Sequence, residues 1–219
     1  MASTQIEIVP TILATSPEQY QQFIAAYQGF AKRVQLDISD GQFTPTVTIP
    51  AAGLTWPENW MMDIHMMVAR PSEHLANLIA MKPHMVIFHA ETGEDLLPIF
   101  DQLRAAGIKC GVALAKPTYP PKVKSFIEAA DHVLIFAGKL GQQGSDADIL
   151  QTEKVPLITK IKSDIEIGWD GGANMKNVRA IAHTGISVIN VGAALATSSN
   201  PAATYDELVK EADRKGVAL

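Results

Sequence analysis

Two aspartates stand where apolar strand patterns end, far apart along the sequence. Apolar and polar residues alternate over 33–38, which places Gln35 and Asp37 on one face of a predicted strand. Asp170 ends a second apolar segment and is followed by two glycines. Two carboxylates that face a substrate from opposite sides can remove a proton from one face of a carbon and return one to the other. This pair of residues therefore predicts the inversion of a carbon acid.

A histidine in a third segment could complete a metal site. The pattern over 61–67 places Asp63, His65 and Met67 on one face of a predicted strand. Removing a proton next to a carbonyl requires a metal ion or preorganised donors at the developing oxyanion. Carboxylate, imidazole and amide oxygen together can bind a divalent ion such as Zn²⁺, Mn²⁺ or Fe²⁺. The alternative for His65 is a core residue that has found a hydrogen bond. Asp63 lies one layer deeper, where we expect a buried, hydrogen-bonded side chain.

Glycine clusters follow the last three predicted strands and indicate an anion site. They are Gly138, Gly141 and Gly144, then Gly171 and Gly172, and finally Gly192 with Ala193. Backbone N–H groups at helix starts bind phosphate, and barrel enzymes often hold a phosphate in this region. The alternative for the first cluster is a tight turn. The arrangement of all three clusters favours a phosphorylated substrate.

The elements that must position these residues alternate along the chain. Eight apolar segments predict strands at 6–13, 33–38, 61–67, 84–89, 109–114, 132–137, 165–170 and 187–192. Helix patterns lie at 16–30, 71–81, 94–107, 121–130, 146–163, 174–185 and 201–216. This alternation implies right-handed parallel crossovers. We expect a single α/β domain over 1–219, a (β/α)8 TIM barrel, with a doubly wound open sheet as the alternative. The second crossover is short, because 50–60 contains two prolines and a glycine and cannot hold a full helix.

Composition argues against several classes of partner. The chain has 219 residues, of which 47% are hydrophobic and 19% charged, as suits a well-filled core. Its net charge of -5 and the lack of a long basic segment argue against nucleic acid and against a polybasic membrane contact. The single cysteine, Cys110, excludes an intrachain disulfide and is expected to be a buried structural thiol. The N-terminal segment is typical neither of a signal peptide nor of a membrane anchor, so a cytoplasmic protein is expected.

Six short motifs are spread over nearly the whole chain. They are VPTIL at 9–13, LDISDGQFTP at 36–45, MDIHMMV at 62–68, FHAE at 88–91, DGG at 170–172 and VGAAL at 191–195. In these motifs the sequence resembles the ribulose-phosphate 3-epimerase family. The resemblance implies a barrel enzyme that interconverts ribulose 5-phosphate and xylulose 5-phosphate through an enediolate on a bound divalent metal. Because members of that family are usually oligomeric, it also implies a homo-oligomer.

The resemblance assigns roles to particular residues. It implies that Asp37 and Asp170 are the two acid and base residues, and that both bind the metal together with His65. Thr11 would stand near the substrate, and Met67 would belong to an apolar cap over the enediolate. The glycine clusters complete the expected substrate contacts, which are Gly141, Gly144, Gly171, Gly172, Gly192 and Ala193.

Some residues depart from the family pattern. Gln35 stands where the family has a histidine as fourth metal ligand, and an amide oxygen is a weaker ligand, so a weakly bound metal is expected. Ser39 and Phe136 replace methionines of the cap, and the loop after the sixth strand reads LGQQGS at 140–145. His89 could contact substrate or order a water network. These departures leave two alternatives: an epimerase or isomerase for another ketose phosphate, and a phosphosugar-binding homologue without turnover.

Overall fold

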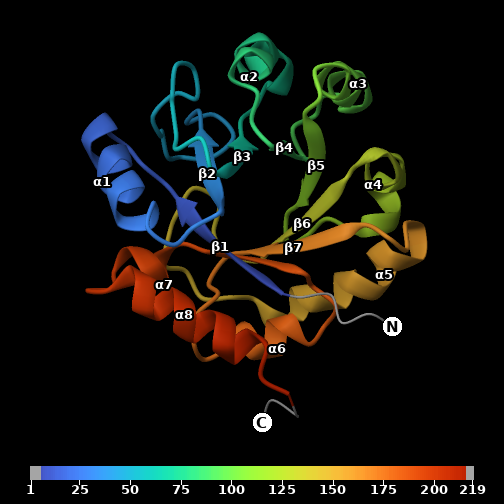
Figure 1. Cartoon of the computed structure of the whole chain (residues 1–219). Helices are drawn as coiled ribbons and strands as arrows, with labels where there is room; N and C mark the ends of the chain where they lie inside the picture. The colour runs from blue at the N-terminus through green and yellow to red at the C-terminus, as the bar shows by residue number, and fades with distance from the viewer. Residues whose placement is uncertain (1–5, 216–219) are drawn as a thin grey trace.

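Eight parallel strands close into a barrel in sequence order in the computed structural model, which describes residues 6–215 (Figure 1). The strands are β1 (Glu7–Ile12), β2 (Arg33–Ser39), β3 (Met61–Met67), β4 (Met85–His89), β5 (Lys109–Leu114), β6 (His132–Phe136), β7 (Glu166–Asp170) and β8 (Val188–Val191). Because β1 pairs in parallel with both β2 and β8, the sheet closes on itself. The predicted TIM barrel is confirmed, and the open sheet is excluded.

Each strand is buried on both faces, for two different reasons. Side chains such as Val34, Leu36 and Ile38 of β2 belong to the apolar core between the barrel and its helices. The residues that alternate with them point into the barrel, where successive side chains of a strand must lie on opposite faces. A polar side chain at an inward position near a strand's carboxyl end therefore lies at the mouth of the barrel.

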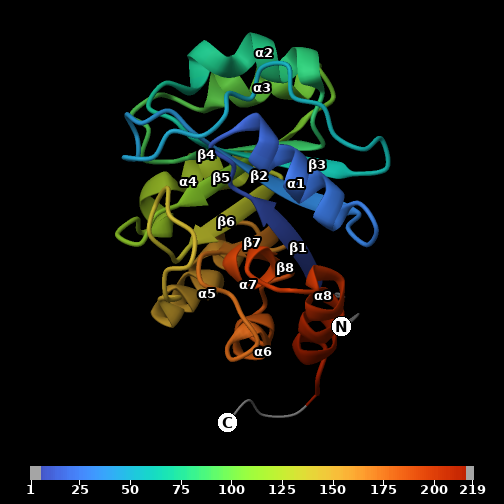
Figure 2. The same ribbon diagram turned by 90° about the vertical axis from the view of Figure 1, so that its left-hand side faces the viewer.

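Helices surround the strands on all sides (Figures 1 and 2). They are α1 (Pro17–Tyr27), α2 (Leu75–Met81), α3 (Leu97–Ala105), α4 (Lys124–Ala129), α5 (Lys154–Ile161), α6 (Val178–Ala182), α7 (Ala193–Ala196) and α8 (Pro201–Ala212). The first and last are the longest, and each begins at a side-chain cap. Ser16 accepts the N–H of Gln19, and Asn200 accepts the N–H of Ala203. No helix within residues 6–215 is long and apolar enough to cross a membrane.

Several predicted helices are shorter than their sequence patterns, and two of them have a clear local cause. The pattern over 146–163 becomes a 3₁₀ turn, Ile149–Glu153, followed by α5. Pro156 explains this, because a proline has no N–H and is tolerated only in the first turn of a helix. The pattern over 174–185 yields only α6. Side chains of Asn174 and Asn177 accept backbone N–H groups before it and so compete with a helical start.

The second crossover contains no helix over 40–60, as predicted. It appears as a loop between α1 and α2 (Figure 1). Asp40 fixes its start, since one carboxylate oxygen accepts the N–H groups of Gln42 and Phe43 and the other accepts the N–H of Ala69. The loop therefore has a defined path beside the mouth of the barrel, although it lacks regular structure.

An ionic network closes the opposite end of the barrel. Arg33 donates to Asp63 at 2.6 Å and to Glu166 at 2.8 Å. His84 contacts Asp63 at 2.7 Å, and His132 contacts Glu166 at 2.7 Å. Asp63 is therefore the buried, hydrogen-bonded residue expected from its depth, and both histidines belong to the floor of the barrel.

Candidate active site

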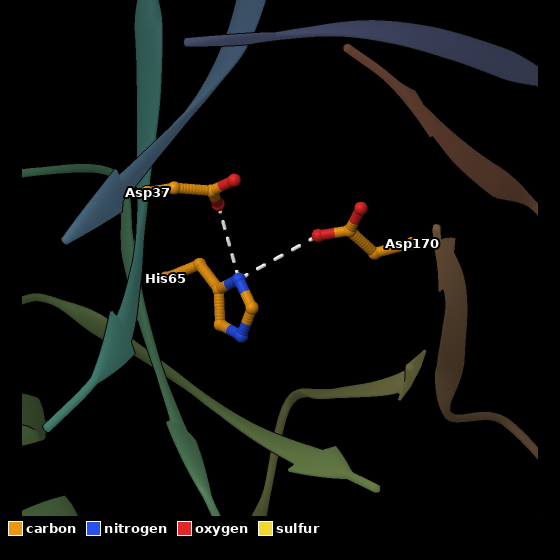
Figure 3. Close-up of side chains that lie close together, drawn as sticks. All are labelled: Asp37, His65 and Asp170. Carbon is orange, nitrogen blue, oxygen red and sulfur yellow. Dashed lines mark hydrogen bonds and ion pairs between the residues drawn. The ribbon is translucent and has the colours of Figure 1, made fainter. Parts of the chain in front are cut away.

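The mouth of the barrel brings together three of the predicted residues from three strands. Asp37 of β2 and His65 of β3 are direct partners in the parallel register, and Asp170 ends β7. His65 Nδ1 lies 3.1 Å from Asp37 Oδ1 and 3.5 Å from Asp170 Oδ2. Figure 3 shows this nitrogen facing both carboxylates. All three residues are buried, so His65 is the nearest group that can offset the negative charge of the two carboxylates.

These three side chains suit a divalent metal ion. Their ligand atoms all lie within 4.8 Å of one another. Ligands about 2.0–2.2 Å from a tetrahedral ion are separated by roughly 3.3 Å, which is close to the spacing from the ring nitrogen to each carboxylate. One imidazole and two carboxylates form a donor set for Zn²⁺, Mn²⁺ or Fe²⁺.

Gln35 lies beside the cluster with its amide N–H₂ turned inward. Its Nε2 donates to Asp37 Oδ1 at 3.0 Å and to Asp170 Oδ2 at 2.6 Å. Its Oε1 is buried and has no hydrogen-bonding partner among the described residues. The amide oxygen was the atom expected to bind metal, whereas the structure presents the nitrogen. The physical reason is that two carboxylates need donors, and an amide oxygen could only repel them.

Burial and the neighbouring charges shift the pKa values of Asp170 and His65. Burial, and then the charge of Asp37, raises the pKa of Asp170 to about 7. Burial alone would lower the pKa of His65, but the hydrogen bond and charge of Asp37 and the charge of Asp170 raise it above its ordinary value. Near neutral pH, Asp170 can therefore hold or release a proton, as an acid–base group must.

A cavity lies directly above the cluster and is lined by both aspartates. Its lining also contains every residue expected to contact substrate, namely Thr11, Met67, Gly141, Gly144, Gly171, Gly172, Gly192 and Ala193. Thr11 Oγ1 is buried without a hydrogen-bonding partner among the described residues, so a polar ligand would satisfy it. Lys139 contributes a cationic side chain to the same lining.

The two glycines after β7 allow the neighbouring loop to approach closely. A Cβ on Gly171 would lie 2.1 Å from the backbone nitrogen of Gly138, and one on Gly172 would lie 2.3 Å from that of Ala147. Both have positive φ, at 112° and 70°, which favours glycine. The N–H of Gly171 bonds the carboxylate of Asp170. It therefore orients the aspartate, which leaves Gly172, Gly192 and Ala193 as the backbone groups considered for phosphate.

The structure also shows where His89, Ser39 and Phe136 lie relative to the cavity. His89 is fully buried and does not line the cavity; instead it contacts His65, 2.9 Å between the two Nε2 atoms. Ser39 also lies outside the lining, because its hydroxyl bonds Thr44 and the carbonyl of Thr46. Phe136 lines the cavity, in keeping with its expected place in the cap.

Sequence reasoning gave no role to Glu91 and Asn190. Asn190 is the register partner of Asp170 and lines the cavity. Its position two residues before Gly192 on an alternating strand was the signal that could have identified it. Glu91 contacts His89 at 3.1 Å. It stands inside the FHAE motif, but only the fold shows that it faces the histidine.

Comparisons with known proteins agree with this geometry. The profile of the Ribulose-phosphate 3 epimerase family matches residues 7–196. The ribulose-phosphate 3-epimerase of Schizosaccharomyces pombe is 26% identical over 204 residues, which cover 90% of both chains. That of Mycobacterium tuberculosis strain H37Rv is 26% identical over 222 residues, covering 97% of this chain and 95% of the relative. The solved structure of 3-hexulose-6-phosphate synthase from Salmonella typhimurium matches with a TM-score of 0.69 at 15% identity, covering 94% of this chain and 98% of that one. This last likeness concerns the fold.

Proposed function

Because the chain belongs to the ribulose-phosphate 3-epimerase family, we propose that it inverts C3 of a ketose phosphate, converting D-ribulose 5-phosphate to D-xylulose 5-phosphate. One observation carries the proposal. Asp37 and Asp170 line the same cavity from separate strands, so one bound sugar can contact both carboxyl groups. A base on one side of the carbon and an acid on the other are what inversion requires.

The proton transfers follow from these positions. Asp37 removes the C3 proton from one face of the bound sugar, and Asp170 delivers a proton to the opposite face; the roles exchange in the reverse direction. Gln35 donates to both carboxylates and so holds them at a fixed separation. Met67 and Phe136 line the cavity with apolar surface, which limits access of water to the enediolate. A divalent ion held by Asp37, His65 and Asp170 would supply Lewis-acid stabilisation of the negative oxygen.

One part of the cavity lining suits the phosphate. Gly172, Gly192 and Ala193 belong to it, with Gly144 and Lys139 of the neighbouring loop. Backbone N–H groups and a lysine are common phosphate ligands. These donors would offset the repulsion between the phosphate and the two aspartates.

Incubation with D-ribulose 5-phosphate in heavy water tests the proposal. The protein, supplied with Zn²⁺ or Mn²⁺, should incorporate deuterium at C3 and form xylulose 5-phosphate, both of which proton NMR resolves. Asp37→Asn and Asp170→Asn should each stop net epimerisation. Deuterium exchange or epimerisation at full rate in both variants would refute the assignment of the two aspartates.

Two other functions remain candidates because specific residues favour them. Phe136 in the cavity lining narrows the choice of sugar, which favours an epimerase or isomerase for another ketose phosphate. The inward amide nitrogen of Gln35 favours a phosphosugar-binding protein without turnover. Exchange with a different ketose phosphate would support the first. Saturable binding of ribulose 5-phosphate without any exchange would support the second.

A further inference from the structure

A line of buried polar side chains leads from the metal cluster away from the cavity. His65 Nε2 lies 2.9 Å from His89 Nε2, and His89 Nδ1 lies 3.1 Å from Glu91 Oε2. Both imidazoles are fully buried. His89 and Glu91 do not line the cavity, so neither contacts a substrate bound there.

The far end of this line is fixed to the backbone. Glu91 Oε1 accepts the N–H of Ala115 at 2.9 Å and also the hydroxyl of Thr118. A carboxylate that accepts two donors on one oxygen is held in its ionised form and in one orientation. Glu91 therefore presents its second oxygen to His89 as an acceptor only.

The donors and acceptors that each side chain offers then set the direction of every hydrogen bond from Glu91 to His65. His89 Nδ1 must donate, because Glu91 can only accept. His89 is fully buried and contacts the rings of Phe43 and Phe136, at centroid distances of 5.0 and 5.7 Å, and burial away from water disfavours a charged imidazole. A neutral imidazole with a proton on Nδ1 has a lone pair on Nε2. His65 Nε2 must therefore carry a proton and donate it to His89.

We propose that Glu91, acting through His89, is a positioning residue that sets the tautomer of His65. With its Nε2 proton held by His89, His65 can offer the lone pair of Nδ1 to a cation shared with Asp37 and Asp170. This inference rests on the metal site of the proposed function. Partners behind a metal-binding histidine fix its ring and tautomer, and their loss typically weakens metal affinity by about 10- to 100-fold.

Glu91→Gln should reverse the direction of each hydrogen bond between residue 91 and His65, while keeping the size of the side chain. In this variant the new amide oxygen would accept from Ala115 and Thr118, and the new N–H₂ would face His89. His89 Nδ1 must then accept, so its proton moves to Nε2. His65 Nε2 must accept in turn, so the one proton that His65 keeps is on Nδ1, where it blocks the metal.

The test uses nitrogen NMR of protein labelled in its histidines, without metal, because the two tautomers of His89 have distinct ring-nitrogen shifts. The wild type should show His89 protonated on Nδ1, and Glu91→Gln should show it protonated on Nε2. In calorimetric titration with Zn²⁺, Glu91→Gln should bind about 10- to 100-fold more weakly. Glu94→Gln is the matched control. Glu94 accepts from the N–H and hydroxyl of Ser72 and should leave both readouts unchanged.

An unchanged His89 tautomer in folded Glu91→Gln, or unchanged Zn²⁺ affinity, overturns the inference. If Glu91→Gln does not fold, His89→Phe provides a second reading, because it removes the acceptor of the His65 Nε2 proton. His65 then has no partner that keeps a proton on Nε2, so Zn²⁺ binding should weaken, and an unchanged Zn²⁺ affinity would also overturn the inference. Failure of the proposed function is separate: it would appear as absent epimerisation in the wild type, whereas the tautomer of His89 is read without substrate or metal.

Discussion

Gln35 provides the sharpest test of how this site handles a metal ion. Its amide nitrogen donates to Asp37 at 3.0 Å and to Asp170 at 2.6 Å, while its oxygen faces away without a partner among the described residues. A cation drawn into the cluster needs the lone pairs that the amide now occupies. Gln35 should therefore compete with the metal, and Gln35→His should remove the competition and add a ligand.

The size of this effect follows from the two hydrogen bonds. A hydrogen bond to a charged group contributes about 1.5–3 kcal/mol. Losing at least one of them on metal binding costs about 10- to 100-fold in affinity, at about 1.4 kcal/mol per tenfold. Gln35→His should thus bind Zn²⁺ or Mn²⁺ about 10- to 100-fold more tightly than the wild type. Gln35→Leu removes the amide donor without adding a ligand, so it should bind at least as tightly as the wild type.

Calorimetric titration of the three metal-stripped proteins at one fixed pH measures these affinities, with circular dichroism as the check on folding. If Gln35→Leu binds metal more than about tenfold more weakly than the wild type, the amide oxygen turns inward and is a ligand, and the competition argument is wrong. If Gln35→His matches the wild type, residue 35 lies outside the metal shell. Both results would be visible without any assay of catalysis.

Asp170→Asn should lower the rate of epimerisation by about 10²- to 10⁴-fold, the usual contribution of an acid–base group, while circular dichroism stays unchanged and partial solvent exchange survives through Asp37. The metal-free protein should lose stability as the pH rises, because the pKa of Asp170 is raised from 3.8 to about 7 and that of His65 is raised too. Both groups bind protons more tightly in the folded state, so their contribution is complete at low pH and is lost as pH rises through their folded pKa values. Carboxylates with lowered pKa values, such as Glu91 and Glu166, contribute in the opposite direction at acid pH, so the measurement is thermal unfolding from mildly acid to mildly alkaline pH. A profile for Asp170→Asn that is no flatter than that of the wild type would contradict the prediction. Arg33→Met should cost about 3–5 kcal/mol in urea unfolding because it leaves Asp63 buried without its cation, yet it should leave KM unchanged, and a large rise in KM would show that the floor of the barrel reaches the active site.

Sequence alone was sufficient to place Asp37, His65 and Asp170 at one rim. The alternation over 33–38 and 61–67 fixes which side chains share a face, since a strand has a period of two. A closed parallel barrel then gathers the carboxyl ends of all strands at its mouth. Asp37, His65 and Asp170 meet there for these two reasons: the first is local to each strand, and the second follows from the fold that the alternation of strands and helices predicts.

What the sequence could not provide are the orientations within the cluster. The direction of the Gln35 amide depends on two carboxylates that come from different strands, of which Asp170 lies 135 residues away. The contact between His65 and His89 depends on the register of β3 and β4 and on inward packing across the barrel. Such contacts are decided by barrel closure, for which no local pattern exists.

The charges of the two carboxylates must be balanced within the mouth of the barrel, because the cation of the floor is already paired. Arg33 bonds Asp63 and Glu166 there. When no metal ion is bound, three features offset the negative charge of the two carboxylates: the raised pKa of Asp170, the imidazole of His65 and the amide N–H₂ of Gln35. Each of these donors occupies lone pairs that a metal would use. The groups that stabilise two buried carboxylates in this fold therefore also limit the affinity for a metal ion, because the metal must displace them. Glutamine at position 35 favours the protonated, metal-free cluster, with both aspartates in the same positions.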